Sequence, residues 1–153
     1  MMTHSPGGAL AVLLLQTGTS CFMSGLIWTM QILSYPLLAL VGIGNVPSYE
    51  QAHNRRFIRL VGPGVAIAIA TAVIMVFWRT HGVPLAVPIA ALILLAVIIA
   101  STIRHGAPAH ARLAQQFDPA VHALLVRTNW IRTAAWSMLG VLDLIAIALA
   151  VHS

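Results

Sequence analysis

The sequence contains very few charged side chains and no lysine. Asp, Glu, Lys and Arg make up 7% of its 153 residues, whereas soluble domains average about 25%. The first of these charged residues is Glu50, and apolar residues reach 59% of the chain. This composition excludes an ordinary soluble domain and indicates an integral membrane protein.

Cysteine is nearly absent as well. Cys21 is the only one, which excludes an intrachain disulfide and a CxxC redox pair. The net charge of +5 comes from eight arginines. Because these arginines flank apolar runs, membrane topology explains them, and we expect membrane lipids and no nucleic acid as partners.

Four apolar runs are long enough to cross a bilayer, which takes about 20 residues each. They cover residues 9–35, 59–78, 84–103 and 132–151. The runs predict an all-α integral membrane four-helix bundle that forms a single domain over residues 1–153. Pro36 predicts a kink or a stop after the first run. Asp118 followed by Pro119 predicts that the last helix starts near residue 119, as an N-cap followed by proline does.

The placement of the arginines predicts the orientation of the bundle. The connections 37–58 and 104–131, with the residues bordering them, hold all the arginines except Arg79. Short loops rich in arginine usually face the cytoplasm. We therefore expect a multi-pass protein of the inner (plasma) membrane, with these connections inside the cell and both termini outside.

Polar side chains follow one face of the first span, at steps of three and four residues that return to the same side of a helix. They are Thr17, Ser20, Ser24, Trp28, Gln31 and Tyr35. Small polar residues often form packing seams between membrane helices, which fits the first three. Gln31 and Tyr35 lie nearer the arginine-rich side, and there we expect them to line a pocket.

The last span carries a second polar stripe. His122, Asn129, Trp136 and Asp143 follow each other at intervals of seven, and Arg132 borders them. A membrane anchor with snorkelling arginines and interfacial tryptophans would not need Asn129 or Asp143. We expect Asp143 to be either protonated or hydrogen-bonded to hydroxyls such as that of Ser24.

Four of the seven histidines lie in the arginine-rich half: His53, His105, His110 and His122. Glu50 and His53 are three apart, and such pairs build metal sites in helix bundles when other helices add ligands. The set Glu50, His53, His110 and His122 suits iron, copper, zinc or manganese. A haem held by two of the histidines also fits, as does the simpler alternative that each histidine faces water or headgroups.

Several segments together resemble a known family. They are SYPLLALVG, YEQAHNRRFIRLVGP, PAHARLAQQFD and LVRTNWIRTAAW. They look like those of small four-helix membrane proteins, mostly uncharacterised and bacterial, that are similar to fungal anthrone-oxygenase-like proteins. The resemblance covers roughly residues 28–140 and is most specific at 129–133. It implies a four-helix bundle that oxidises a lipophilic aromatic substrate with O₂.

The resemblance also places polar positions of the family at His53, His110, His122, Asn129 and Arg132. From the resemblance we derive the hypothesis of a membrane-embedded oxygenase or oxidase that acts on a lipophilic aromatic or quinone-like molecule. Its catalytic candidates are His53, His122, Asn129 and Arg132. Arg132 and Asn129 would bind an anionic or phenolate oxygen.

In this hypothesis Gln31, Tyr35 and Trp136 would line an apolar pocket. The cofactor would be iron, copper or haem, with Glu50 as a fourth metal ligand or a base. In a metal-free version a histidine would deprotonate the substrate, which would then react with O₂. The alternative is a non-catalytic scaffold or lipid-binding bundle. A transporter of four spans would need to form a homo-oligomer.

Overall fold

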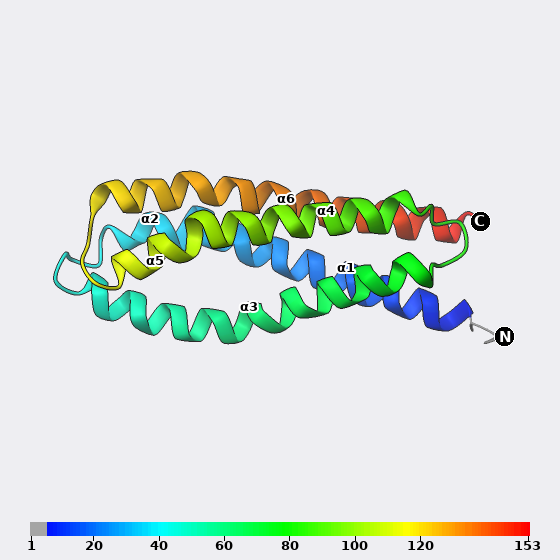
Figure 1. Cartoon of the computed structure of the whole chain (residues 1–153), viewed down its shortest axis with the longest axis horizontal. Helices are drawn as coiled ribbons and strands as arrows, with labels where there is room; N and C mark the ends of the chain where they lie inside the picture. Colours follow the sequence, from blue (N-terminus) through cyan, green and yellow to red (C-terminus); the bar gives the residue numbers. More distant parts are fainter. Residues whose placement is uncertain (1–5) are drawn as a thin grey trace.

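The computed structural model describes residues 6–153 as four long antiparallel helical rods (Figure 1). The elements are α1 (Pro6–Thr29), η1 (Met30–Ser34), α2 (Tyr35–Leu38), α3 (Val46–Phe77), α4 (Ala86–Ser101), η2 (Thr102–Gly106), α5 (Ala107–Leu113) and α6 (Pro119–Val151), where η1 and η2 are π-helical turns. No strand occurs within residues 6–153. The predicted all-α four-helix bundle is therefore confirmed.

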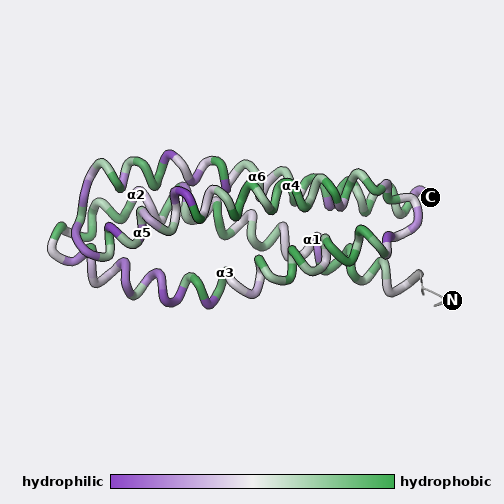
Figure 2. The backbone as a smooth tube through the Cα atoms, in the orientation of Figure 1, coloured by the Kyte–Doolittle hydropathy of each residue, from purple (hydrophilic) through white to green (hydrophobic). Residues whose placement is uncertain are grey.

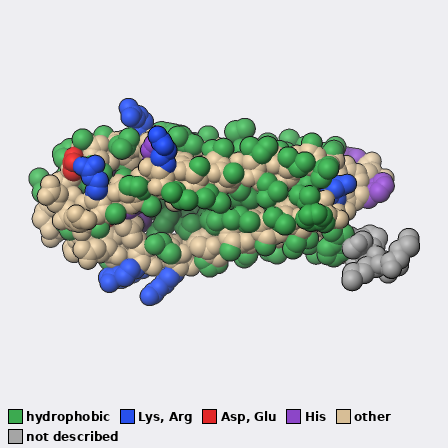
Figure 3. Space-filling model, in the orientation of Figure 1, with side chains coloured by type: hydrophobic (Ala, Val, Ile, Leu, Met, Phe, Trp, Pro, Cys, Tyr) green, Lys and Arg blue, Asp and Glu red, His purple; other side chains and the backbone are tan. Residues whose placement is uncertain are grey.

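Each rod is long and apolar enough to cross a membrane, so the chain is a multi-pass membrane protein. The four candidate spans are Gly7–Leu38, Val46–Phe77, Ala86–Leu113 and Pro119–Val151. Hydrophobic residues predominate along the rods between the two ends of the bundle (Figure 2). In Figure 3 most of the arginines gather near the end that holds the connections 39–45 and 114–118; this end is called the arginine-rich end below.

The helices extend well beyond the predicted spans at the arginine-rich end. Most of the predicted connections 37–58 and 104–131 is helical, and only residues 39–45 and 114–118 form loops there. The predicted start of the last helix is confirmed, because α6 begins at Pro119. Asp118 caps it by accepting hydrogen bonds from the backbone N–H groups of Ala120 and Val121, at 2.8 and 3.3 Å.

The two π turns have the same local cause. Pro36 and Pro108 lack an N–H, so neither can donate to the carbonyl four residues earlier. Immediately before each proline the backbone donates five residues back, from Tyr35 to Met30 and from Ala107 to Thr102. The helix therefore continues through Pro36 as far as Leu38. Each proline is accommodated by a wide turn rather than by a break.

The four rods pack in a ring in which α1 and α4 both contact α6, and α3 contacts α1 and α4. Small residues let the backbones approach: Ala68 and Ala72 are fully buried. A Cβ at Gly64 would come within 2.7 Å of Met23 Sδ. The two seams that α3 forms, with α1 and with the α4–η2–α5 rod, are less closely packed than the two that α6 forms.

The polar face predicted on the first span forms hydrogen bonds to α6. Ser20 donates to Asp143 Oδ2 at 2.6 Å, and Trp28 Nε1 donates to Ser137 Oγ at 3.0 Å. Asp143 is fully buried, and its hydroxyl partner is Ser20, whereas Ser24 pairs with Ser137. This part of the face is thus a polar seam that joins the first rod to the last.

Candidate functional site

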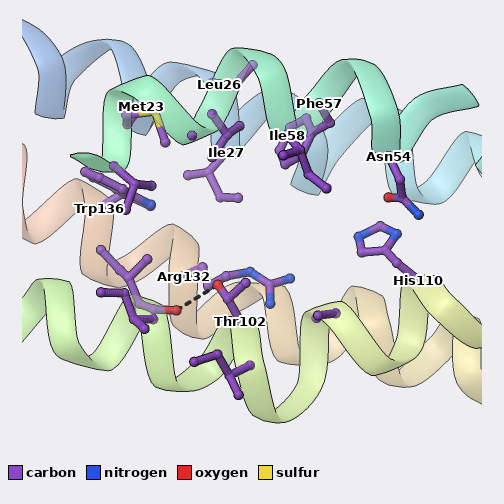
Figure 4. A pocket seen from close by; sticks show the side chains of 18 of the residues that line it. Met23, Leu26, Ile27, Asn54, Phe57, Ile58, Thr102, His110, Arg132 and Trp136 are labelled. Carbon is purple, nitrogen blue, oxygen red and sulfur yellow. Dashed lines mark hydrogen bonds between the residues drawn. The ribbon is translucent and has the colours of Figure 1, made fainter. Parts of the chain in front are cut away.

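A cavity of about 610 Å³ lies between α3 and the α4–η2–α5 rod, with α1 and α6 forming its base. Its walls are mostly aliphatic, and Trp136 and Phe57 add aromatic surface (Figure 4). Five polar residues interrupt this lining: Tyr35, Asn54, Thr102, His110 and Arg132. The size and the few converging polar groups are typical of a small-molecule site.

A chain of hydrogen bonds leads from the cavity wall into the protein. The Tyr35 hydroxyl lies 3.2 Å from His110 Nε2, and His110 Nδ1 lies 2.8 Å from Glu50 Oε2. Glu50 is 1% exposed. An ionised carboxylate only accepts hydrogen bonds, so with Glu50 ionised Nδ1 of His110 carries a proton, and in the neutral imidazole Nε2 then accepts from the Tyr35 hydroxyl. Carboxylate, imidazole and hydroxyl in this order form an acid–base unit, since the carboxylate fixes the tautomer of the base.

His53 lies behind this unit in a stack of rings. Its ring centroid is 5.9 Å from that of Tyr49, 5.3 Å from that of Phe57 and 6.1 Å from that of His110. Its Nε2 is buried without a hydrogen-bond partner. His53 does not line the cavity; it supports the face of His110.

Arg132 supplies the cationic group of the cavity. It is 5% exposed, and its Nη1 is buried without a hydrogen-bond partner. The ion pairs within residues 6–153 are His110–Glu50 and Arg112–Asp118, so no carboxylate neutralises Arg132. Burying an uncompensated charge costs several kcal/mol. An anionic group bound in the cavity would offset that cost.

Two features hold the Arg132 guanidinium in place. Its Nε donates to Asn129 Oδ1 at 2.9 Å. On the other side it lies against the bare backbone of Gly106 in η2, where an added Cβ would collide with the guanidinium. π turns are frequent at functional sites, and here one provides the close approach that the arginine needs.

Asn129 and Gln31 position Arg132 and do not line the cavity. Asn129 Nδ2 donates to Gln31 Oε1 at 2.9 Å, and Gln31 Nε2 donates to the carbonyl of Val126 at 3.3 Å. With its oxygen on Arg132 and an N–H on Gln31, Asn129 has little capacity left for a substrate. Of the three predicted pocket residues, Tyr35 and Trp136 do line the cavity.

The predicted four-ligand metal site does not form. Among the residues that the structure describes, no three His, Cys, Asp or Glu side chains are placed to hold a metal ion. Glu50 and His53 lie close to His110, but His122 does not join them. Its Nε2 is 2.7 Å from the backbone carbonyl of Tyr35, and its ring packs on Phe117. His122 therefore ties α6 to α2, and Glu50 is occupied by His110.

The residues missed at the sequence level are the ones that shape the cavity. Asn54 follows His53 directly, and Thr102 and Gly106 belong to η2. A glycine shortly before Pro108 is a visible signal in RHGAP. However, Gly106 matters because it leaves room for Arg132, which belongs to another helix. The pairing of Tyr35 with His110 likewise joins residues far apart in the chain.

Comparison with known proteins assigns no function to this site. No protein-family model, curated protein or solved structure matches the chain. A functional interpretation therefore depends on the cavity and its side chains.

Proposed function

We propose that this protein is a membrane-embedded oxygenase that uses O₂ to oxidise an acidic methylene group of a lipophilic, phenol-like substrate. The supporting observation is an apolar cavity in which the uncompensated cation of Arg132 and the Tyr35–His110–Glu50 unit occur together. An anion site beside a base suits a substrate that becomes an enolate or phenolate when it loses a proton.

In this mechanism His110 accepts the proton, through the Tyr35 hydroxyl or directly, while Glu50 keeps Nδ1 protonated. Histidine suits this role because its ordinary pKa of about 6.5 allows both protonation states near neutral pH. Arg132 binds the oxygen on which negative charge develops, as preorganised donors do in oxyanion sites. The apolar walls exclude water and thereby strengthen both interactions.

The reaction balances without another reductant. Removal of a C–H proton leaves a carbanion, whose electron pair forms a C–O bond with O₂, and the resulting peroxide takes up a proton. Loss of the second C–H proton then breaks the O–O bond and leaves a carbonyl and water. The carbon loses four electrons and O₂ gains four, so that CH₂ and O₂ give C=O and H₂O.

Oxygen uptake by the protein in lipid nanodiscs, with anthrone as probe substrate, tests this proposal. We expect uptake above that of empty nanodiscs, with one anthraquinone formed per O₂. Arg132→Gln should abolish the excess, because it removes the cation. Arg127→Gln is the matched control, since Arg127 is exposed and outside the cavity. Uptake equal to that of empty nanodiscs, or unaffected by Arg132→Gln, would overturn the proposal.

The second candidate is a non-catalytic lipid-binding bundle, and the aliphatic walls of the cavity favour it. It predicts that lipophilic molecules bind in the cavity and that no O₂ is consumed. The same oxygen measurement therefore separates the two functions.

For the location, we propose the inner (plasma) membrane with the arginine-rich end in the cytoplasm. The gathering of arginines at one end supports this orientation through the positive-inside rule. Both termini would then face outward.

A further inference from the structure

The cavity opens sideways along the seam between α3 and the α4–η2–α5 rod. On α3 its rim consists of Ile58, Gly62 and Ala66, which are all exposed. On the opposite side the rim includes Ile103 and Ala107, which are exposed too. Ile58 and Ile103 are each 68% exposed. A mouth lined by exposed aliphatic residues suits contact with lipid and not with water.

The polar and apolar parts of the cavity follow the order of a lipid leaflet. Asn54 and His110 lie toward the arginine-rich end, whereas Met23 lies deeper in the bundle (Figure 4). Ile69 follows Ile58 on α3 and lies further from that end. From Ile58 to Ile69 the helix rises about 16 Å at 1.5 Å per residue. That is close to half of the hydrocarbon layer, which is about 30 Å thick. The cavity thus spans roughly one leaflet.

Two exposed arginines mark the headgroup level at this mouth. Arg59 follows Ile58 on α3, and Arg104 follows Ile103 on η2. Long cationic side chains at such positions place their charge among the headgroups while their stems stay in lipid. The polar end of the cavity therefore lies at the membrane interface, and its apolar end points toward the midplane.

We infer that the ligand enters sideways from the leaflet at the arginine-rich end, as an anionic amphiphile. Its acidic head, a carboxylate or a phenolate, binds Arg132, and its hydrocarbon tail lies along α3 toward Ile69. The inference depends on the role that the proposed function gives to Arg132, and it narrows the substrate to molecules already dissolved in the bilayer. An anionic head is favoured over a neutral one, because the buried guanidinium of Arg132 has no carboxylate partner within residues 6–153.

Photolabelling tests this inference without depending on catalysis. The probes are a palmitate analogue with a diazirine in its tail and the corresponding alcohol, each added to nanodiscs of phosphatidylcholine. The readout is label on Ile27 and Trp136, which are 7% and 2% exposed and line the cavity. We expect the acid to label them more strongly than the alcohol, and Arg132→Gln to remove the difference.

A blocking variant tests the sideways route. Gly62→Trp should reduce labelling by the acid to the level of the alcohol, because its side chain would fill the mouth. A Cβ added at Gly62 would meet nothing within 4 Å, so the backbone at this position accepts a side chain. Gly25→Trp is the matched control, since Gly25 is equally open but outside the cavity, and its labelling should equal that of the wild type.

Competition by unlabelled molecules identifies which class of compound carries the acidic head of the ligand. Unlabelled palmitate and an unlabelled long-chain alkylphenol should both displace the probe, and the stronger competitor indicates a fatty acid or a lipophilic phenol. Failure of both to compete would overturn the inference, as would equal labelling by acid and alcohol or full labelling of Gly62→Trp.

The outcomes also separate this inference from the proposed oxygenase. Labelling that depends on Arg132 without any O₂ uptake supports the sideways route and overturns the enzyme. Oxygen uptake that is the same in Gly62→Trp and in the wild type overturns the route and leaves the enzyme standing.

Discussion

Asn129→Asp tests the anion site with an almost isosteric change. Asn129 is fully buried, and its Oδ1 already lies 2.9 Å from Arg132 Nε. The substitution places a carboxylate at that position and so supplies the counter-ion that Arg132 lacks. It also removes the hydrogen bond donated to Gln31, while the new ion pair offsets that loss. We therefore expect the variant to fold with a thermal unfolding temperature near that of the wild type.

The effect on ligand binding follows from Coulomb's law. The introduced carboxylate would lie on the order of 7 Å from a bound anionic head, and with an effective dielectric constant of about 20 it would repel that head by about 2.4 kcal/mol. This corresponds to about 50-fold weaker binding. The assay is the concentration of unlabelled palmitate that halves photolabelling of Trp136.

Arg127→Gln is the control for net charge, because it also makes the protein more negative by one unit but at an exposed position. Its half-displacing concentration should stay at the wild-type value. An anion site at Arg132 is refuted if Asn129→Asp binds palmitate as tightly as the wild type, or if Arg127→Gln weakens binding equally.

Three further predictions concern catalysis, stability and topology. Glu50→Gln should lower anthrone-dependent O₂ uptake by at least about tenfold, because the tautomer of His110 would no longer be fixed. Ser20→Ala should destabilise the bundle by about 1–3 kcal/mol, because the buried carboxyl group of Asp143 loses its hydroxyl partner; chemical unfolding in mixed micelles measures this. Arg112→Cys in a variant without Cys21 should resist a membrane-impermeant maleimide in intact cells.

Each of these predictions has a control in which the same kind of change is made at another position. Asp118→Asn also changes a carboxylate to an amide and keeps a residue that caps helices well, so its O₂ uptake should be normal. Thr19→Ala removes an exposed hydroxyl bonded within its own helix and should cost little stability. Arg79→Cys, at the opposite end, should react with the maleimide. Equal effects in a variant and its control would contradict the corresponding prediction.

The fold could be predicted from the sequence because it depends on properties of single segments. Length and hydropathy determine whether a segment spans the bilayer, and the pair Asp118–Pro119 determines where α6 begins. The early start of α3 could not be seen in the same way. Residues 46–58 are too polar to resemble a span, and they become helical as an extension of the apolar helix that follows.

The candidate site was harder to predict because its chemistry depends on pairings between helices. The sequence placed Glu50, His110 and His122 in the same half of the bundle, which is correct. It could not show that Glu50 bonds His110, or that His122 bonds a backbone carbonyl. A histidine has two ring nitrogens, and the partner of each is decided by a neighbouring helix and not by spacing along the chain.

The two π turns act as phase shifts in otherwise regular helices. Each turn accommodates one additional residue, and one residue corresponds to about 100° of rotation in an α-helix of 3.6 residues per turn. Without the extra residue in η1, the side chain of Tyr35 would point in a different direction relative to the residues before the turn. The side chain of His110, which follows η2, would be rotated in the same way. The orientation of these two side chains is therefore set by the number of residues in a wide turn. A single deletion in η1 would turn the Tyr35 phenol away from its partner without changing any residue of the cavity.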